Sequence, residues 1–275
     1  MTAPEAFHVH SGSTALIGER WPGEGGAAAP TVVLLHSGVT DRRSWTEVAS
    51  ALAGATVLAY DRRGYGDTGP AEEEYTHLAD LLAVLDHEVD GPAWLVGNSA
   101  GGALALDLTL TAPELVAGLV LISPSISGSP EMEYDRATTA LGEQLEAAEH
   151  DGDLDEVNRL ETWIWLDGPT SREGRVSGPP RDLLLEMNGL ALRNDAEFGE
   201  FDGRSGLPAW DRLAEIEVPV LVVCGDLDVP GYLYRSRIVA ERVRRGRFVA
   251  LTGRGHLPAL EDPGEIADLI RTAMG

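Results

Sequence analysis

The stretch Gly97-Asn98-Ser99-Ala100-Gly101 follows directly on the apolar run 92–96 and precedes an apolar helical pattern at 103–108. A buried strand therefore ends where a helix begins, and Ser99 lies at the tip of the turn between them. Such a sharp turn brings the flanking backbone segments close together and forces its central residue toward positive φ. Only residues without a side chain fit at the two outer positions, which explains the glycines on both sides of Ser99.

Outward from this turn, short β-branched apolar runs alternate with longer segments of helical spacing, which is typical of a mostly parallel sheet flanked by helices. At 275 residues and 43% hydrophobic content, the chain is long enough for one large α/β domain with an insertion. Strands are expected at 31–35, 56–60, 93–96, 119–122, 218–224 and 248–251, with an antiparallel edge hairpin within 7–21. Helices are expected at 44–53, 78–89, 103–108 and 265–273. Either Thr40 or Asp41 is expected to cap the first of these helices.

The pattern changes between residues 123 and 208, where strand-like runs give way to acidic helical segments. Helices are predicted at 134–149, 154–165 and 181–193, and in the last of them five apolar residues share a face: Leu183, Leu184, Met187, Leu190 and Ala191. We interpret this region as a helical cap inserted between the sixth and seventh core strands. The predicted organisation is a core at 1–123, a cap at 124–210 and the rest of the core at 211–275.

Charge and cysteine content restrict the possible partners. The chain carries 45 acidic and 21 basic residues, a formal net charge of −24, which argues against nucleic acid and anionic membrane surfaces as partners. A solvated acidic surface is the simplest explanation, with adaptation to high salt as the alternative. No run of about 18 apolar residues and no secretory leader is visible, and the single Cys224 is expected to be buried in the core. These features predict a cytoplasmic protein, with a monomer or a homodimer equally compatible.

Ser99 needs a base to take its proton, and a histidine base needs a carboxylate to fix its tautomer. His256 is the predicted base, because it follows the last strand in a glycine-rich loop. Asp226 and Asp228 both follow the strand before it, and we favour Asp228 as the acid, leaving Asp226 to hydrogen-bond the loop backbone. All candidates then lie beyond the carboxyl ends of strands, where sites of open α/β sheets assemble. His36 is interpreted as a residue that shapes its loop.

An oxyanion requires backbone N–H donors, and two are expected to converge on it. One is the amide of Ala100, which follows Ser99, and the other is the amide of Gly38 in the turn after strand 31–35. Ser37 can offer its hydroxyl to substrate or oxyanion. In the predicted cap, Trp163 and Trp165 are two residues apart, so at most one is expected to line a pocket, and Trp165 is the candidate for substrate contact.

Five motifs, in this order along the chain, resemble those of capped, esterase-like enzymes of the α/β-hydrolase fold. They are His36-Ser37-Gly38, Asp61-Arg62-Arg63-Gly64-Tyr65-Gly66, Gly97-Asn98-Ser99-Ala100-Gly101-Gly102, Gly225-Asp226-Leu227-Asp228 and Gly255-His256-Leu257-Pro258. The resemblance implies hydrolysis of a small-molecule carboxylic ester or lactone through an acyl-serine intermediate, without metal or organic cofactor. It also implies a structural role for the loop 61–66.

Two positions depart from the family pattern and keep other activities open. Ser37 stands where the family usually has glycine, and Leu257 stands where the carbon–carbon hydrolases of ring-fission products usually have tryptophan. The Gly-Asn-Ser-x-Gly-Gly turn resembles that of the same carbon–carbon hydrolases. The alternatives are therefore carbon–carbon cleavage, a non-hydrolytic reaction such as that of a lyase, perhydrolase or tailoring cyclase, and, least favoured, a non-catalytic ligand-binding relative.

Overall fold

The computed structural model describes residues 3–70, 74–199 and 203–275. In these residues a single eight-stranded sheet runs in the order β1-β2-β4-β3-β5-β6-β7-β8. Its strands are β1 (Glu5–Ser11), β2 (Thr14–Trp21), β3 (Thr31–Leu35), β4 (Thr56–Tyr60), β5 (Ala93–Asn98), β6 (Val116–Ile122), β7 (Val220–Gly225) and β8 (Gly246–Leu251). Strand β2 is antiparallel to both neighbours, and the remaining pairs are parallel. The mostly parallel sheet and the edge hairpin are as predicted.

The central strands are apolar on both sides because helices cover both faces of the sheet. In β3, Val33 and Leu35 point into one hydrophobic cluster. Val32 and Leu34 point into the cluster on the opposite face. This burial on both faces explains why the parallel strands read as continuous apolar runs rather than as alternating patterns.

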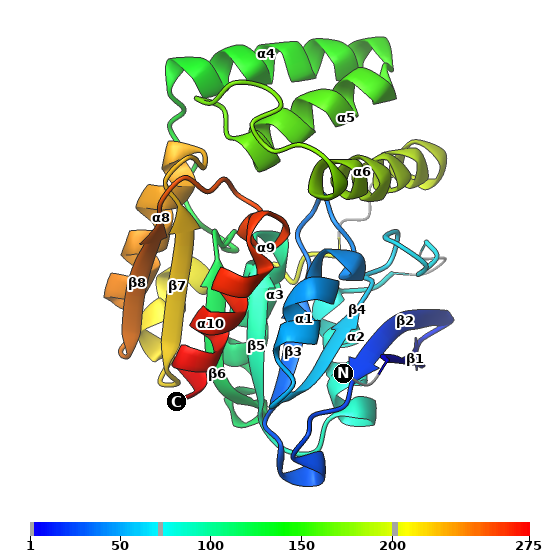
Figure 1. Cartoon of the computed structure of the whole chain (residues 1–275), viewed down its shortest axis with the longest axis vertical. Helices are drawn as coiled ribbons and strands as arrows, with labels where there is room; N and C mark the ends of the chain where they lie inside the picture. The colour runs from blue at the N-terminus through cyan, green and yellow to red at the C-terminus, as the bar shows by residue number, and fades with distance from the viewer. Residues whose placement is uncertain (1–2, 71–73, 200–202) are drawn as a thin grey trace.

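The two layers of helices are formed by different parts of the chain. Helices that contribute to the first cluster are α2 (His77–Glu88), α3 (Ala100–Thr111), α7 (Ala209–Arg212) and α8 (Pro230–Arg242). Those that contribute to the second are α1 (Thr46–Ala51), α9 (Pro258–Glu261) and α10 (Pro263–Met274). Figure 1 shows α1 and α10 together in front of the sheet. The first and the last helix of the chain therefore cover the same face of the sheet.

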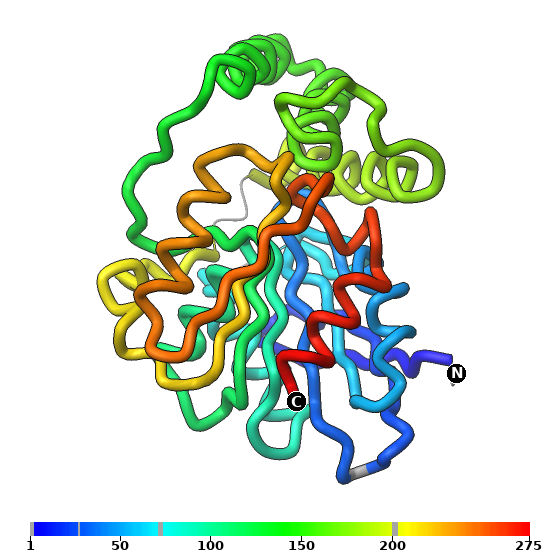
Figure 2. Tube along the Cα trace, turned by 60° about the vertical axis from the view of Figure 1, so that its left-hand side comes forward, coloured from blue at the N-terminus to red at the C-terminus, as the bar shows by residue number. Residues whose placement is uncertain are grey.

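Three further helices lie between β6 and β7 in the chain: α4 (Arg136–Asp151), α5 (Leu154–Thr162) and α6 (Pro179–Phe198). Figures 1 and 2 show them stacked beyond one end of the sheet, above the loops that follow β3, β5, β7 and β8. They therefore stand over the carboxyl ends of the strands. Residues 200–202 of the predicted cap lie outside the described residues.

Several element boundaries differ from the prediction for local physical reasons. Strand β7 begins after Pro219, which has no N–H to donate to a ladder. The helix expected at 44–53 starts as a 3-10 turn (Arg42–Trp45), and Asp41 caps it by accepting from the amide of Arg43 at 2.9 Å. The helix expected at 154–165 changes at Trp163 into a π-helical turn (Trp163–Asp167).

The cap helix α6 is longer than the predicted 181–193. Of the five residues assigned to its apolar face, Leu184 and Met187 are buried, together with Asn188 and Gly189, while the other three are only partly buried. Helix α8 was not predicted at all. In the described part of the chain, none of the helices combines the length and apolarity needed to cross a membrane.

Candidate active site

Ser99 sits at a strained turn between β5 and α3. Its backbone has φ 52° and ψ −113°, a conformation that residues with side chains rarely adopt. A Cβ on Gly97 would lie 2.3 Å from the carbonyl oxygen of Gly101, and one on Gly101 would lie 2.1 Å from that of Leu35. Both glycines are therefore required by close backbone approach, and together they hold the Ser99 hydroxyl at the end of the sheet.

His256 and Asp228 form a buried pair at the ends of the two neighbouring loops. The imidazole Nδ1 of His256 lies 2.9 Å from Oδ2 and 3.0 Å from Oδ1 of Asp228, and both residues are at least 95% buried. Asp226 is exposed, and its carboxylate accepts from the amide of Gly253 at 2.7 Å. The arrangement places Asp228 against the histidine and leaves Asp226 to hold the loop backbone.

The residue before Ser99 ties the two halves of the site together. The side-chain amide of Asn98 donates to the carbonyl oxygen of Ile122 at 3.0 Å and to that of His256 at 3.2 Å. One buried amide thus fixes the end of β5 against both β6 and the histidine loop. Asn98 was noted in the sequence only as part of the motif, because its long-range partners depend on tertiary structure.

Ser125 lies next to the Ser99 hydroxyl, and Tyr232 contacts Ser125. Neither residue was singled out from the sequence. Ser99 Oγ lies 3.5 Å from Ser125 Oγ, and Ser125 Oγ lies 3.2 Å from the hydroxyl of Tyr232. The first distance is at the limit of hydrogen bonding, so the contact holds the nucleophile only weakly. Burial raises the pKa of Tyr232, which keeps its phenol protonated.

Aromatic rings enclose the imidazole of His256. The Tyr232 ring, from α8, lies 4.6 Å from the imidazole, and the Trp165 ring, from the π-helical turn, lies 4.8 Å from it. The backbone amide of His256 also donates to the carbonyl oxygen of Trp165 at 3.1 Å. Trp163 instead donates its indole N–H to the carbonyl oxygen of Ser171. Of the two cap tryptophans, Trp165 is the one placed at the site.

The turn after β3 presents Gly38 beside the site. Helix α3 begins at Ala100, and in the described part of the chain neither the Ala100 amide nor the Gly38 amide has an acceptor. The Ser37 amide and hydroxyl are both bonded to Thr40 Oγ1, at 3.1 and 2.9 Å. Two amides are thus available to an oxyanion, whereas the Ser37 hydroxyl is engaged within the turn.

His36 and the loop after β4 support this turn. Burial lowers the pKa of His36 well below its ordinary value, so the ring is neutral. Its Nδ1 lies 2.8 Å from the carbonyl oxygen of Ser37, and its Nε2 accepts from the amide of Arg62 at 3.0 Å. In the same loop Asp61 accepts from the amides of Arg42 and Asp67. These contacts are structural, and none of them reaches Ser99.

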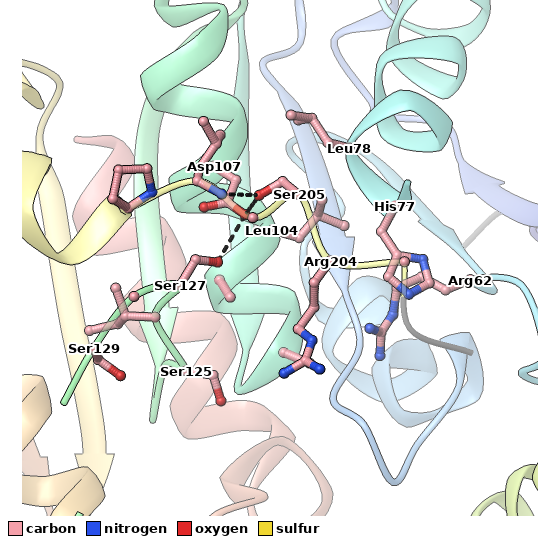
Figure 3. Close-up of a pocket in the computed structure, with 18 of the residues that line it drawn as sticks. Arg62, His77, Leu78, Leu104, Asp107, Ser125, Ser127, Ser129, Arg204 and Ser205 are labelled. Atoms are coloured by element: carbon pink, nitrogen blue, oxygen red, sulfur yellow. Dashed lines mark hydrogen bonds between the residues drawn. The ribbon is translucent and has the colours of Figure 1, made fainter. Parts of the chain in front are cut away.

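A cavity of about 800 Å³ opens beside the turn, lined by Ala100 and Ser125. Figure 3 shows Asp107 on one side of it, hydrogen-bonded to Ser127 and Ser205. Among the described residues, no group of three or more His, Cys, Asp or Glu side chains could hold a metal ion. The cavity can hold a small organic molecule; Ser99, Asp228 and His256 do not line it, and it reaches the turn through Ala100, the residue after Ser99, and through Ser125.

Comparison with known proteins shows the family to which the chain belongs. A family model described as "Alpha/beta hydrolase family" matches residues 32–269. The chain belongs to this family. It is 31% identical over 268 residues to "Lipase LipV" of Mycobacterium tuberculosis, covering 91% of this chain and 95% of the lipase.

Other relatives of this alpha/beta hydrolase differ in their printed activities. A hydrolase of 2-hydroxy-6-oxo-6-(2'-aminophenyl)hexa-2,4-dienoic acid from Metapseudomonas resinovorans is 28% identical, covering 74% of this chain and 70% of that one. The solved structure of Est816, described as an N-acyl homoserine lactone degrading enzyme, superposes with a TM-score of 0.70 at 25% identity. It covers 97% of this chain and 99% of Est816. The protein is thus an enzyme of a hydrolase family whose members act on several bonds.

Proposed function

We propose that the protein is a serine hydrolase that cleaves a small-molecule carboxylic ester or lactone through an acyl-serine intermediate. The observation that carries the proposal is the strained Ser99 at the end of the sheet, where the preceding Asn98 is hydrogen-bonded to the backbone of His256 and His256 in turn pairs with the buried Asp228. A lipase among the relatives and a lactone-degrading enzyme among the similar structures support the substrate class.

In the proposed mechanism Ser99 Oγ leaves its weak contact with Ser125 and attacks the carbonyl carbon, while His256 Nε2 takes the hydroxyl proton. Asp228 holds Nδ1–H and stabilises the imidazolium. The negative charge that develops on the carbonyl oxygen is received by the amides of Gly38 and Ala100. His256 then gives the proton to the leaving alkoxide, and water, activated by the same histidine, releases the acid.

We also propose that residues 124–210 act as the cap over this site. The contact of Trp165 with His256 and the buried cluster of Leu166, Leu184, Met187, Leu257 and Leu260 support this role. Leu257, the residue after the candidate base, is 1% exposed within that cluster. Its side chain therefore anchors the cap to the core.

The experiment that tests the proposal is steady-state hydrolysis of p-nitrophenyl acetate, butyrate and octanoate by the wild type and Ser99→Ala. Removing the nucleophile should lower kcat/KM by about a thousandfold or more. Ser177→Ala, a change to an exposed serine that does not line the cavity, is the matched control and should retain activity. A folded Ser99→Ala enzyme that keeps its turnover would contradict the acyl-serine mechanism.

Carbon–carbon hydrolysis is the second candidate, favoured by the relative from Metapseudomonas resinovorans and by the Gly-Asn-Ser-x-Gly-Gly turn. It would use the same three residues on an activated ketone instead of an ester. A wild type that is folded but inactive on all three esters, and active on a vinylogous 1,5-diketo acid, would favour this candidate.

A further inference from the structure

Four arginines are buried in the described part of the chain: Arg42, Arg62, Arg63 and Arg235. Two of them have carboxylate partners. Arg42 pairs with Asp61 and Asp67, and Arg63 is held by both oxygens of Asp80 at 2.9 Å. Neither of these paired arginines lines the cavity beside Ser99.

The other two, Arg62 and Arg235, have no carboxylate partner among the described residues and both line the cavity. Arg62 is 5% exposed, donates to the carbonyl oxygen of Ser37 at 2.7 Å, and has an Nε without any hydrogen-bond partner. Arg235 is 9% exposed and donates to the carbonyl oxygen of Pro130 at 3.0 Å. Arg62 also has the His36 ring at 3.3 Å and the Tyr65 ring at 4.8 Å from its Cζ, but all of these partners are neutral and none compensates the charge of either cation.

Each guanidinium group contacts a different residue in the surroundings of the candidate site. Arg62 binds the residue before Gly38, in the turn proposed to hold the oxyanion. Arg235 lies with its Cζ 5.8 Å from the ring of Tyr232, whose hydroxyl is in contact with Ser125. A ligand in the cavity therefore meets the positive charge of both arginines.

An unpaired buried cation is costly, and it persists where a bound anion supplies the missing charge. The chain has 45 acidic residues, yet none of the described carboxylates pairs with either of these two arginines. Asp107 also lines the cavity, but Figure 3 places it on the side opposite Arg62, with its Oδ2 occupied by Ser127 and Ser205. The exposed Arg204 between them makes contacts of its own.

We propose that the substrate carries a free carboxylate in addition to its scissile ester, and that Arg62 and Arg235 bind this carboxylate in the cavity. The inference rests on the proposed function for the reaction, but the binding site it describes does not depend on turnover. A neutral ester of the same length would fill the same space without compensating either guanidinium.

The test uses two esters that differ only at one end, monoethyl adipate and ethyl hexanoate. In the wild type, followed in a pH-stat, kcat/KM for the anionic ester should exceed that for the neutral ester by about tenfold or more, the range of a charge-assisted hydrogen bond. Arg62→Met and Arg235→Met should each reduce this ratio severalfold. Arg62→Lys should restore part of it, and Arg247→Gln, at an exposed arginine of β8, should leave it unchanged.

Binding of the same two esters to Ser99→Ala, measured by titration calorimetry, separates this inference from the proposed function. Tighter binding of monoethyl adipate supports the carboxylate site even if the wild type hydrolyses neither ester. Equal or tighter binding of ethyl hexanoate would overturn the inference even if Ser99-dependent ester hydrolysis is observed. This comparison keeps all cavity arginines in place, so it decides the matter even where an arginine variant fails to fold.

Discussion

Asp107 lines the cavity on the side opposite Arg62. Its Oδ2 accepts from Ser127 and Ser205, while its buried Oδ1 has no hydrogen-bond partner. Burial raises the pKa of Asp107 above its value of 3.8 in an unfolded chain. The ionised form is thus destabilised in the folded protein.

Asp107→Asn should therefore change stability in a pH-dependent way. Because the folded-state pKa is raised, the native state holds its proton more tightly, and the contribution of Asp107 to stability falls as pH rises above the unfolded value. The melting temperature of Asp107→Asn relative to wild type should increase from about pH 4 to about pH 7. Asp86→Asn, at an exposed position of α2, is the control. A difference that is constant with pH, or that decreases, would contradict the assignment.

The candidate site residues that could be predicted from the sequence are those that directly follow a strand. Ser99, Asp228 and His256 were predicted because each stands just beyond an apolar run, at the sheet edge where sites assemble. Ser125 and Tyr232 were not, because Ser125 lies in a loop and Tyr232 in an unpredicted helix. Only the folded chain brings their hydroxyls within 3.2 Å of each other.

The close packing of the first turn of α3 against the end of β3 requires glycine at position 101. A Cβ on Gly101 would meet the backbone of Leu35 and His36, which cannot move away as a flexible side chain could. Gly142 in the cap helix α4 has no atom within 4 Å of its Cβ position, so the same change there meets only open space.

The two glycines form a matched pair for mutation. Gly101→Ala should lower the free energy of unfolding by more than about 2 kcal/mol through overpacking. Gly142→Ala should raise it by about 0.5–1 kcal/mol, because alanine favours a helix interior. Urea unfolding measures both. A Gly101→Ala protein as stable as wild type would show that the turn after β5 is looser than described.

Helix α8 shows why some elements were missed. Its buried positions are Tyr232, Arg235, Ser236, Val239 and Ala240, which have the correct helical spacing. Two of the five are polar, so no apolar stripe is visible in the sequence. Arg235 interrupts the apolar pattern of α8 and is one of the two arginines assigned to the proposed carboxylate site. A charged residue at a buried helix position is expected where function requires it.

For the molecule as a whole, Arg175 joins the cap to the core. Its guanidinium donates to the carbonyl oxygens of Leu166 in the cap and Gly253 in the core, and to Glu261 at 2.6 Å. Glu261 in turn accepts from the amide of Gly255, the residue before His256. The clamp therefore connects the position of the cap to that of the candidate base.

Arg175→Met should weaken both folding and catalysis. Leaving the carboxylate of Glu261 buried without its partner should lower the free energy of unfolding by about 3 kcal/mol. We also expect kcat/KM for esters to fall, since Trp165 and the histidine loop lose a common support. Arg172→Met, at an exposed position of the same loop, should affect neither quantity. Full activity in Arg175→Met would show that the clamp does not position the site.

The arrangement of cap over core could be predicted from the sequence only as an insertion between two strands. Which cap residue reaches the base depends on the π-helical turn Trp163–Asp167, whose wider winding turns Trp165 toward His256. The net charge of −24 gave no indication that three arginines, Arg62, Arg204 and Arg235, line the cavity.

The central claim is that Ser99 becomes acylated during turnover. The direct measurement is intact-protein mass spectrometry of enzyme quenched in acid during hydrolysis of p-nitrophenyl butyrate, followed by peptide mapping. The acyl-serine mechanism predicts one added butyryl group per chain, located on Ser99 and absent from Ser99→Ala. A butyryl group on another residue, or the same adduct in Ser99→Ala, would contradict it.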